Sequence, residues 1–173
     1  MFFSRWETSP FQAATTEEED LALKPKESRR SFHYQSRMAW DVGRIGNASV
    51  DGKPVLRVSS PPEFKGDPAC WSPEDMLVAA ADACLLMTFL AYAQREELEL
   101  VCYESDADGT LEFADGRYRF TEVTLHPRLS FRTEEDAEIA QVVLEQAHRD
   151  CIITNSVTAA VNLEPEISVE RAP

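Results

Sequence analysis

The longest apolar segment of the chain, from Pro73 to about Arg95, predicts one long helix. Ser72 is a favourable N-cap, and Pro73 suits a first helical position that needs no N–H donor. Glu74 and Asp75 then complement the positive end of the helix dipole. Apolar side chains follow on nearly every face, and a helix without a polar face is buried on all sides. We therefore expect a second subunit to cover this helix; the alternative is a central helix wrapped by the chain's own sheet.

Strand patterns flank this helix on both sides in the sequence. Before it, with turns at residues 43–47 and at Asp51-Gly52, strands are predicted over residues 32–41, 48–50 and 54–59. After it, with a turn at Asp115-Gly116, strands are predicted over residues 98–106, 109–113 and 118–131. A second helix, capped by Thr133, and a closing strand are predicted over residues 133–149 and 157–169. The pattern predicts an α+β fold with two antiparallel strand meanders around a long, buried central helix.

Residues 1–31 show no sustained periodicity. They combine an acidic run at residues 17–20 with scattered prolines and the basic pair Arg29-Arg30, a composition typical of segments that form no packed core. We predict a flexible N-terminal extension over residues 1–31, followed by a single domain over residues 32–173. A chain of 173 residues has the usual size of one domain.

Charge and composition exclude several classes of function. The chain has 17 Lys and Arg against 31 Asp and Glu, a net charge of −14, so it has no electrostatic attraction to a nucleic acid backbone. No stretch reaches the roughly 18 continuous apolar residues of a membrane-spanning helix, and the N-terminus lacks the pattern of a signal peptide. We expect a cytoplasmic protein with no membrane partner, in a compartment that keeps cysteines reduced.

The candidate chemistry lies in the four cysteines. Cys84 falls in the middle of the long helix, within a stretch of small residues that lets another backbone or a substrate approach closely. Cys151 follows the second predicted helix, in a polar corner. Cys70 lies in a loop and Cys102 in a strand, where a cysteine usually has a structural role or none. From spacing alone, Cys84 and Cys151 are only slightly favoured as functional residues.

Two blocks around these cysteines resemble a known family. Residues 72–84, SPEDMLVAAADAC, resemble the signature N-P-E-[EQ]-L-x-x-A-A-x-x-A-C of the OsmC/Ohr family. Residues 147–157, AHRDCIITNSV, resemble its second cysteine block, A-H-x-x-C-F-I-A-N-S-V, and residues 64–67, FKGD, resemble its F-R-G-D loop. The likeness extends from about residue 32 to residue 166.

The resemblance implies a thiol peroxidase that reduces organic hydroperoxides without a metal or other cofactor. Cys84 then matches the peroxidatic cysteine and Cys151 the resolving one, and an external dithiol or lipoyl-type reductant resets their disulfide. Glu74 matches the family's glutamate, which holds an arginine toward the reactive thiol. The implied fold is an interwound α+β homodimer with active sites at the subunit interface.

The cation of such a site has two candidates. Arg44 resembles the arginine in the G-R-x-G turn of the Ohr branch, whereas Lys65 stands in the loop from which the OsmC branch supplies its arginine. A guanidinium near a thiol lowers the thiol pKa and offers paired donors to the leaving alkoxide, and an ammonium lacks that fork geometry. Met87 is a candidate for an apolar substrate-binding pocket, although a methionine at such a place in a helix usually belongs to the core.

The spacing on the long helix supplies an independent argument. Glu74 and Cys84 are ten residues apart, about 15 Å along a helix axis, so they cannot share one site within one continuous helix. Two such helices packed antiparallel bring Glu74 of one subunit near Cys84 of the other. We therefore predict an obligate homodimer with two composite sites.

Other classes of function have less support. His148 and Cys151 are three residues apart, but a structural zinc site usually shows two paired ligand clusters, and the chain has at most one. The G-x-S-x-G motif of hydrolases and the glycine-rich phosphate loops are absent. A non-catalytic OsmC-like protein that binds a hydrophobic small molecule or senses redox state stays open, because the chain departs from the family pattern at Ser72, Lys65 and Ile152.

Overall fold

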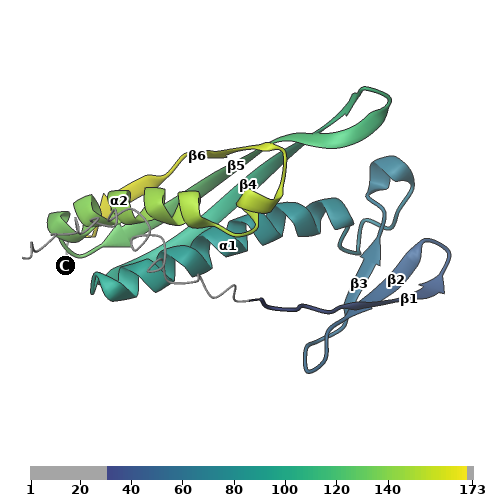
Figure 1. The fold of residues 1–173 in the computed structure, drawn as a ribbon, viewed down its shortest axis with the longest axis horizontal. Helices are drawn as coiled ribbons and strands as arrows, with labels where there is room; N and C mark the ends of the chain where they lie inside the picture. The colour runs from purple at the N-terminus through teal and green to yellow at the C-terminus, as the bar shows by residue number, and fades with distance from the viewer. Residues whose placement is uncertain (1–30, 171–173) are drawn as a thin grey trace, which may run out of the picture. The chain divides into compact units, whose positions relative to one another are not determined.

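The computed structural model describes residues 31–170, nearly all of which belong to one compact unit that begins at Ser36. Apart from Ser31, the predicted N-terminal extension lies outside the described residues, and residues 31–35 form no helix or strand. This unit contains, in chain order (Figure 1), β1 (Arg37–Val42), β2 (Ile45–Ser49), β3 (Leu56–Ser59), the 3-10 helix η1 (Pro62–Phe64), α1 (Pro73–Arg95), β4 (Leu100–Ala114), β5 (Arg117–Phe131), α2 (Glu134–Asp150), the 3-10 helix η2 (Thr154–Ser156), β6 (Ala160–Leu163) and β7 (Glu166–Val169).

The first sheet is an antiparallel meander of β1, β2 and β3 in sequence order. Its two turns contain Gly43 and Gly52, with left-handed φ angles of 55° and 76° that only glycine adopts at little cost. The predicted first meander is confirmed, although β1 begins at Arg37 and not at residue 32. The turn predicted over residues 43–47 is wrong in part, because β2 begins at Ile45 and pairs with β1 from that residue on.

The second sheet is built on a long antiparallel hairpin of β4 and β5. It closes at Asp115 and Gly116, whose φ angles of 53° and 79° are typical of a type I′ turn. The predicted interruption between residues 106 and 109 is wrong. β4 continues through it because Ala107 and Asp108 keep ladder partners in β5.

The closing strand predicted over residues 157–169 is also wrong in part, because it is two strands. β6 and β7 each pair with β5 in parallel. Pro165 stands between them and has no N–H to donate to a ladder. Parallel pairing follows from α2, which carries the chain back along β5, so that β6 starts opposite Glu122 and runs in the same direction as in a β-α-β unit.

Both helices begin where the sequence predicts. α1 opens with a capping box, in which the Asp75 N–H donates to Ser72 Oγ at 3.0 Å and the Ser72 N–H donates to the Asp75 carboxylate at 2.8 Å. At the start of α2, the Asp136 N–H donates to Thr133 Oγ1 at 3.0 Å.

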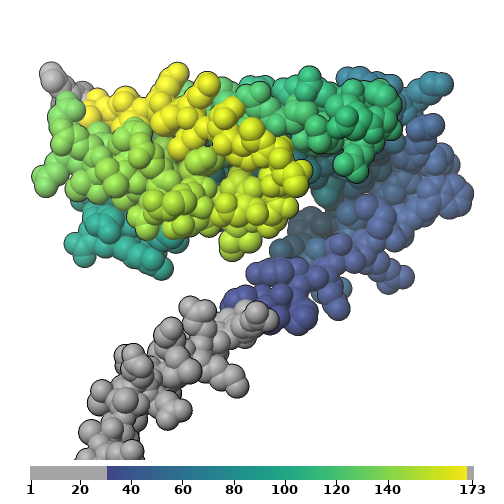
Figure 2. Space-filling model, turned by 45° about the horizontal axis from the view of Figure 1, so that its top comes forward, coloured from purple at the N-terminus to yellow at the C-terminus, as the bar shows by residue number. Residues whose placement is uncertain are grey.

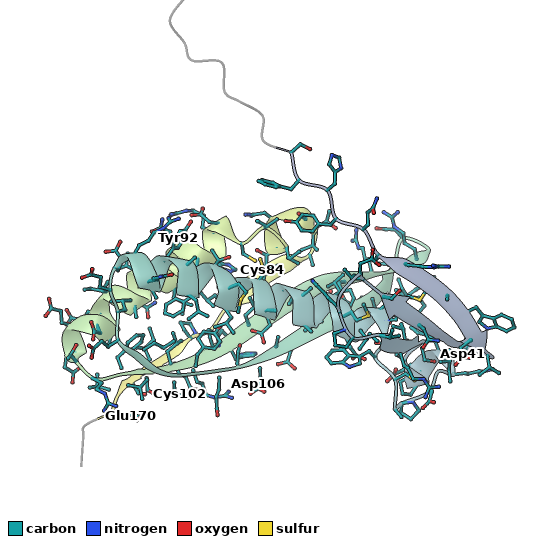
Figure 3. The ribbon with its side chains drawn as sticks, turned by 90° about the horizontal axis from the view of Figure 1, so that it is seen from below. Asp41, Cys84, Tyr92, Cys102, Asp106 and Glu170 are labelled. Atoms are coloured by element: carbon teal, nitrogen blue, oxygen red, sulfur yellow. The ribbon has the colours of Figure 1, made fainter. Side chains whose placement is uncertain are left out.

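The core lies between α1, α2 and the second sheet, which run alongside one another in Figures 1 and 3. α1 contributes a stripe with a spacing of four residues, formed by Ala81, Leu85, Phe89 and Ala93. The stripe packs against apolar side chains of β5 and α2, namely Val123, Leu125, Leu129, Phe131, Ala140, Val143, Leu144 and Ala147. Figure 2 shows α2 and the chain that follows it side by side on one face of this unit.

Within one chain, α1 is buried along this stripe and not on every side. Met87 is 58% exposed and Leu90 is 38% exposed, so the chain's own sheet does not supply the cover that the sequence leads us to expect. By length and composition alone, α1 is also apolar enough to cross a membrane. That is weak support for a membrane protein, because the core helix of a soluble protein passes the same test, and α1 carries the core stripe.

Candidate active site

Cys84 and Cys151 come together from two helices. Cys84 lies midway along α1 (Figure 3), and Cys151 is the C-cap residue of α2, where φ of −64° and ψ of 118° turn the chain out of the helix. The two thiols are in hydrogen-bonding contact and form no disulfide. Cys151 is fully buried, whereas Cys84 is partly exposed. The structure thus brings the two sequence-predicted cysteines into one site and leaves Cys84 open to solvent.

The surroundings of the two thiols shift their pKa values in opposite directions. Burial acts to raise the pKa of Cys84, but hydrogen bonds outweigh it and the pKa is lowered. These bonds come, in decreasing order of effect, from the Cys151 thiol, the main-chain N–H groups of Ile153 and Ile152, and the Thr88 hydroxyl. Burial raises the pKa of Cys151, and its hydrogen bond to Cys84 raises it further. Cys84 is therefore the thiol that ionises more readily.

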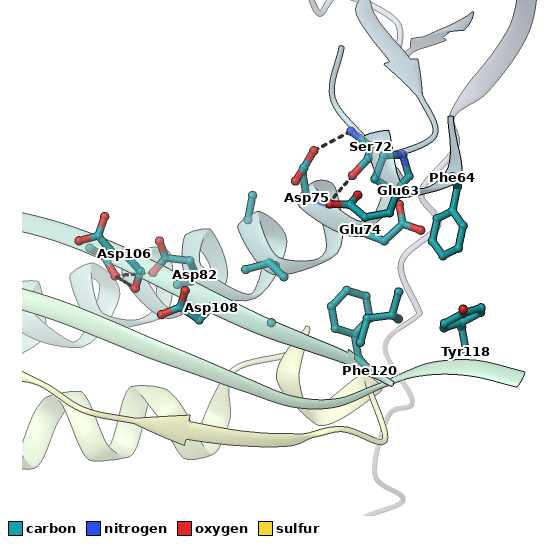
Figure 4. Close-up of a pocket in the computed structure, with 17 residues that line it drawn as sticks. Glu63, Phe64, Ser72, Glu74, Asp75, Asp82, Asp106, Asp108, Tyr118 and Phe120 are labelled. Carbon is teal, nitrogen blue, oxygen red and sulfur yellow. Dashed lines mark hydrogen bonds between the residues drawn. The ribbon is translucent and has the colours of Figure 1, made fainter. Parts of the chain in front are cut away.

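Glu74 lies in a groove at the start of α1, with a cavity volume of about 800 Å³ (Figure 4). The groove has an aromatic wall formed by Phe64, Tyr118 and Phe120, and the Phe64 and Tyr118 rings meet edge to face at 5.3 Å. Most of its polar lining is acidic: Glu63, Glu74, Asp75, Asp82, Asp106 and Asp108. Glu74 Oε2 is buried without a hydrogen-bond partner. Cys84 is not among the lining residues, so one chain does not bring Glu74 to the thiol.

Arg44 and Lys65 both line a shallow depression of about 380 Å³. Arg44 Nη1 donates to the Phe64 carbonyl at 2.8 Å, which ties it to the loop that borders the Glu74 groove. Among residues 31–170, no lysine or arginine is one of the groups that shift the pKa of Cys84. Within one chain, neither predicted cation acts on the thiol.

Two further candidate residues, Met87 and His148, lie on the two helices. Met87 lies one turn beyond Cys84 on the exposed side of α1, so it is open to solvent and not enclosed in a pocket. His148 lies in the last turn of α2, and its Nδ1 is buried without a hydrogen-bond partner. Over the described part of the chain, no three or more His, Cys, Asp or Glu side chains are grouped to hold a metal ion.

The family model of OsmC-like proteins matches residues 66–166. The chain belongs to the OsmC-like family. It is 22% identical over 142 residues to the uncharacterized protein YmaD of Bacillus subtilis. The aligned region covers 80% of this chain and 95% of that protein.

Solved OsmC-like structures share the fold. An OsmC-like protein of unknown function from Vibrio cholerae matches with a TM-score of 0.72 and 23% identity, over 78% of this chain and 99% of that one. An organic hydroperoxide resistance protein, OsmC, from Legionella pneumophila matches with a TM-score of 0.62 and 20% identity, over 80% and 99% of the two chains. An organic hydroperoxide resistance protein from Elizabethkingia anophelis, with thiocyanate bound, matches with a TM-score of 0.60 and 22% identity, over 83% and 100%.

The sequence of this OsmC-like protein gave little sign of several groups that lower the pKa of Cys84. Thr88 lies one helical turn after Cys84; its hydroxyl donates to the Cys84 carbonyl at 2.8 Å and helps to lower the pKa of the thiol. The only sign of this role in the sequence was the position of Thr88 four residues after Cys84, which places the two side chains on one face of a helix. The N–H groups of Ile152 and Ile153 had no signal, because the direction of a main-chain donor does not depend on residue type.

Proposed function

We propose that this OsmC-like protein is a thiol-dependent peroxidase that reduces organic hydroperoxides. The observation that carries the proposal is the contact between Cys84, partly exposed and with a lowered pKa, and Cys151, buried and with a raised pKa. A peroxidatic cysteine must be ionised and accessible, and a resolving cysteine must be close to it. Two structural neighbours named as organic hydroperoxide resistance proteins support the same chemistry.

In the first step, the Cys84 thiolate attacks the terminal oxygen of the hydroperoxide. A sulfur–oxygen bond forms, the oxygen–oxygen bond breaks, and the leaving alkoxide takes up a proton to give the alcohol. The sulfur loses two electrons and becomes a sulfenic acid, and the peroxide gains them.

In the second step, the Cys151 thiol attacks the sulfenic sulfur of Cys84, a disulfide forms, and water leaves. The two thiols are already in contact, so the step requires little movement. An external dithiol, such as a lipoyl group, then restores both thiols by exchange and leaves as its own disulfide. A reducing compartment such as the cytoplasm suits this cycle because it keeps the dithiol reduced.

The proposal includes a homodimer with composite sites. Glu74 has a buried oxygen without a hydrogen-bond partner, and a guanidinium is the group that best satisfies such a carboxylate. Arg44 is favoured over Lys65 as that cation, because Arg44 is bonded to the Phe64 carbonyl at the border of the groove. Antiparallel pairing of two α1 helices would bring Glu74 of one subunit, with its arginine, to Cys84 of the other.

The alternative is a non-catalytic OsmC-like protein that binds a hydrophobic small molecule or senses redox state. One observation favours it: among the described residues, no cation of the same chain lowers the pKa of Cys84. A sensor would form the disulfide once, whereas a peroxidase would turn over repeatedly with a dithiol.

Peptide mass spectrometry after one equivalent of cumene hydroperoxide, followed by a turnover assay with a dithiol, tests the proposal. We expect a rapid Cys84–Cys151 disulfide in the wild type, a trapped sulfenic acid on Cys84 in Cys151→Ser, and no reaction in Cys84→Ser. Cys102→Ser is the matched control, since Cys102 is exposed and distant in the fold, and it should keep the full rate. Disulfide formation without turnover would favour the sensor, and absence of any reaction at Cys84 would refute both redox roles.

A further inference from the structure

The aromatic wall of the groove lies at the same end as Glu74, as Figure 4 shows. Tyr118 is 57% exposed, and its ring meets the rings of Phe64 and Phe113 edge to face, with centroids 5.3 and 5.0 Å apart. The groove volume of about 800 Å³ is within the range of cavities that hold small organic molecules. The groove therefore offers an aromatic surface of suitable size next to Glu74.

The composite site proposed above places the reacting oxygen atoms at this end of the groove. In that site Cys84 of the partner subunit lies near Glu74, so the O–OH group of a bound hydroperoxide lies there too. The organic group of the hydroperoxide then extends onto the aromatic wall, because this wall is the apolar surface next to Glu74.

The polar part of the groove lining carries an excess of negative charge. Two of its carboxylates have a basic partner: Asp106 accepts from Arg128 at 2.8 Å, and Asp108 lies 3.2 Å from His126. Among residues 31–170, no ion pair involves the other four carboxylates, those of Glu63, Glu74, Asp75 and Asp82. In the composite site Arg44 neutralises Glu74, and the remaining three carboxylates keep an uncompensated charge.

We propose that this groove selects hydroperoxides whose organic group is uncharged and apolar, and disfavours those that carry a carboxylate. The inference rests on the proposed function, because it names the substrate class of the same site. One unit charge at about 7 Å in a water-like medium changes a rate or a binding constant by about threefold, so three carboxylates disfavour an anionic substrate by roughly tenfold to thirtyfold. An uncharged aromatic group contacts the wall without this repulsion.

The test compares two hydroperoxides that differ only in charge: cumene hydroperoxide with a para carboxylate, and the methyl ester of that acid. Acid quench and peptide mass spectrometry give the rate at which each oxidises Cys84 in the reduced full-length protein. The same pair with 2-mercaptoethanol gives the intrinsic ratio, which is divided out. We expect the ester to react about tenfold to thirtyfold faster at low ionic strength, and the ratio to fall toward one as salt screens the charges. A ratio close to one at low ionic strength would overturn the inference.

Removal of charge from the groove should narrow this preference. Glu63→Gln keeps the length of the side chain, and Asp82→Asn keeps an oxygen that can accept from the Ser105 hydroxyl, which donates to Asp82 at 2.6 Å. We expect each change to lower the ester-to-acid ratio by about threefold. Glu138→Gln is the matched control, because it removes the same charge from an exposed position on α2 outside the groove, and the ratio should stay unchanged. An equal effect of Glu138→Gln, or no effect of the two groove variants, would contradict the inference.

Binding of the reduced products needs no reaction, so the two proposals fail separately. The products are the tertiary alcohol with a para carboxylate and its methyl ester, and calorimetry compares their affinities for the reduced protein. If no hydroperoxide oxidises Cys84 while the ester still binds more tightly than the acid, the selectivity of the groove stands and the peroxidase proposal falls. If both hydroperoxides oxidise Cys84 at equal rates, the selectivity falls and the peroxidase proposal stands. Neither oxidation of Cys84 nor a preference in binding would refute both.

Discussion

Cys84 depends on hydrogen bonds for its lowered pKa, and the strongest of them comes from Cys151. Cys151→Ala removes that donor, whereas Cys151→Ser keeps an O–H donor at the same place. Because only the thiolate reacts, the alkylation rate of Cys84 rises with pH through its pKa and then levels off. We expect the rise to move to higher pH in Cys151→Ala, with a rate at neutral pH about two- to tenfold lower. Cys151→Ser should stay close to the wild type, and coincident profiles for all three proteins would contradict the prediction.

Exposure distinguishes the two sulfur atoms of the proposed disulfide. A reductant can attack only a sulfur that it can reach, and Cys151 is fully buried while Cys84 is partly exposed. When the oxidised protein is treated with glutathione and quenched with acid, we expect the mixed disulfide on Cys84, with Cys151 as the leaving thiol. Peptide mass spectrometry locates the adduct. Glutathione found mainly on Cys151 would mean that the segment after α2 opens before reduction.

At the same scale, the sequence was enough to find Cys84 and Cys151, since each lies in a block of recognisable residue types. It was not enough to find what tunes them. The main-chain N–H groups of Ile152 and Ile153 lower the pKa of Cys84 through their direction. No residue type at positions 152 and 153 encodes that direction, so only the folded chain could reveal it.

At the scale of elements, the helices were predictable and part of the second sheet was not. A helix start depends on residues a few positions apart, such as Ser72 and Asp75, so its signal is local. The pairing of β6 depends on Glu122 and Ala160, which are far apart in the sequence and meet only after α2 has returned the chain. The break at Pro165 was visible in the sequence, but its consequence, two parallel strands in place of one, was not.

The two helix caps offer a test of this local encoding. Ser72 is 2% exposed, so in Ser72→Ala the Asp75 N–H loses its partner with little access to water. Thr133 is exposed, so in Thr133→Ala water can take over the bond to the Asp136 N–H. We expect losses of about 1–2 kcal/mol for Ser72→Ala and about 0.5–1 kcal/mol for Thr133→Ala. Urea unfolding at one fixed protein concentration measures both, and a larger loss for Thr133→Ala would contradict the argument.

At the scale of the whole molecule, one chain leaves apolar side chains uncovered on β1 and on the outer side of α1. β1 is exposed along its length, with Met38 at 61%, Trp40 at 78% and Val42 at 61%. On α1, Met87 and Leu90 are exposed on the side away from the core stripe. Extended apolar surface of this kind is typical of subunit interfaces. It agrees with the dimer that we propose from the separation of Glu74 and Cys84.

Met87→Lys tests whether that dimer completes the site. A charge on the outer face of α1 should separate the subunits, because burying an unpaired ammonium in an apolar interface is costly. Val142→Lys is the matched control, since Val142 is 65% exposed on α2 and plays no part in the proposed pairing of α1 helices. By light scattering at micromolar concentration, we expect half the wild-type mass for Met87→Lys and an unchanged mass for Val142→Lys.

The chemistry of the separated subunit is the more informative result. Cys84 and Cys151 belong to one chain, so diamide, which oxidises neighbouring thiols directly, should still form their disulfide in Met87→Lys. Glu74 and its arginine would be lost with the other subunit, so reaction with cumene hydroperoxide should slow by about 10²-fold, as when a group that stabilises developing charge is removed. A monomer that reacts with the hydroperoxide at the full rate would place the complete site within one chain, and Glu74 would then have no role in it.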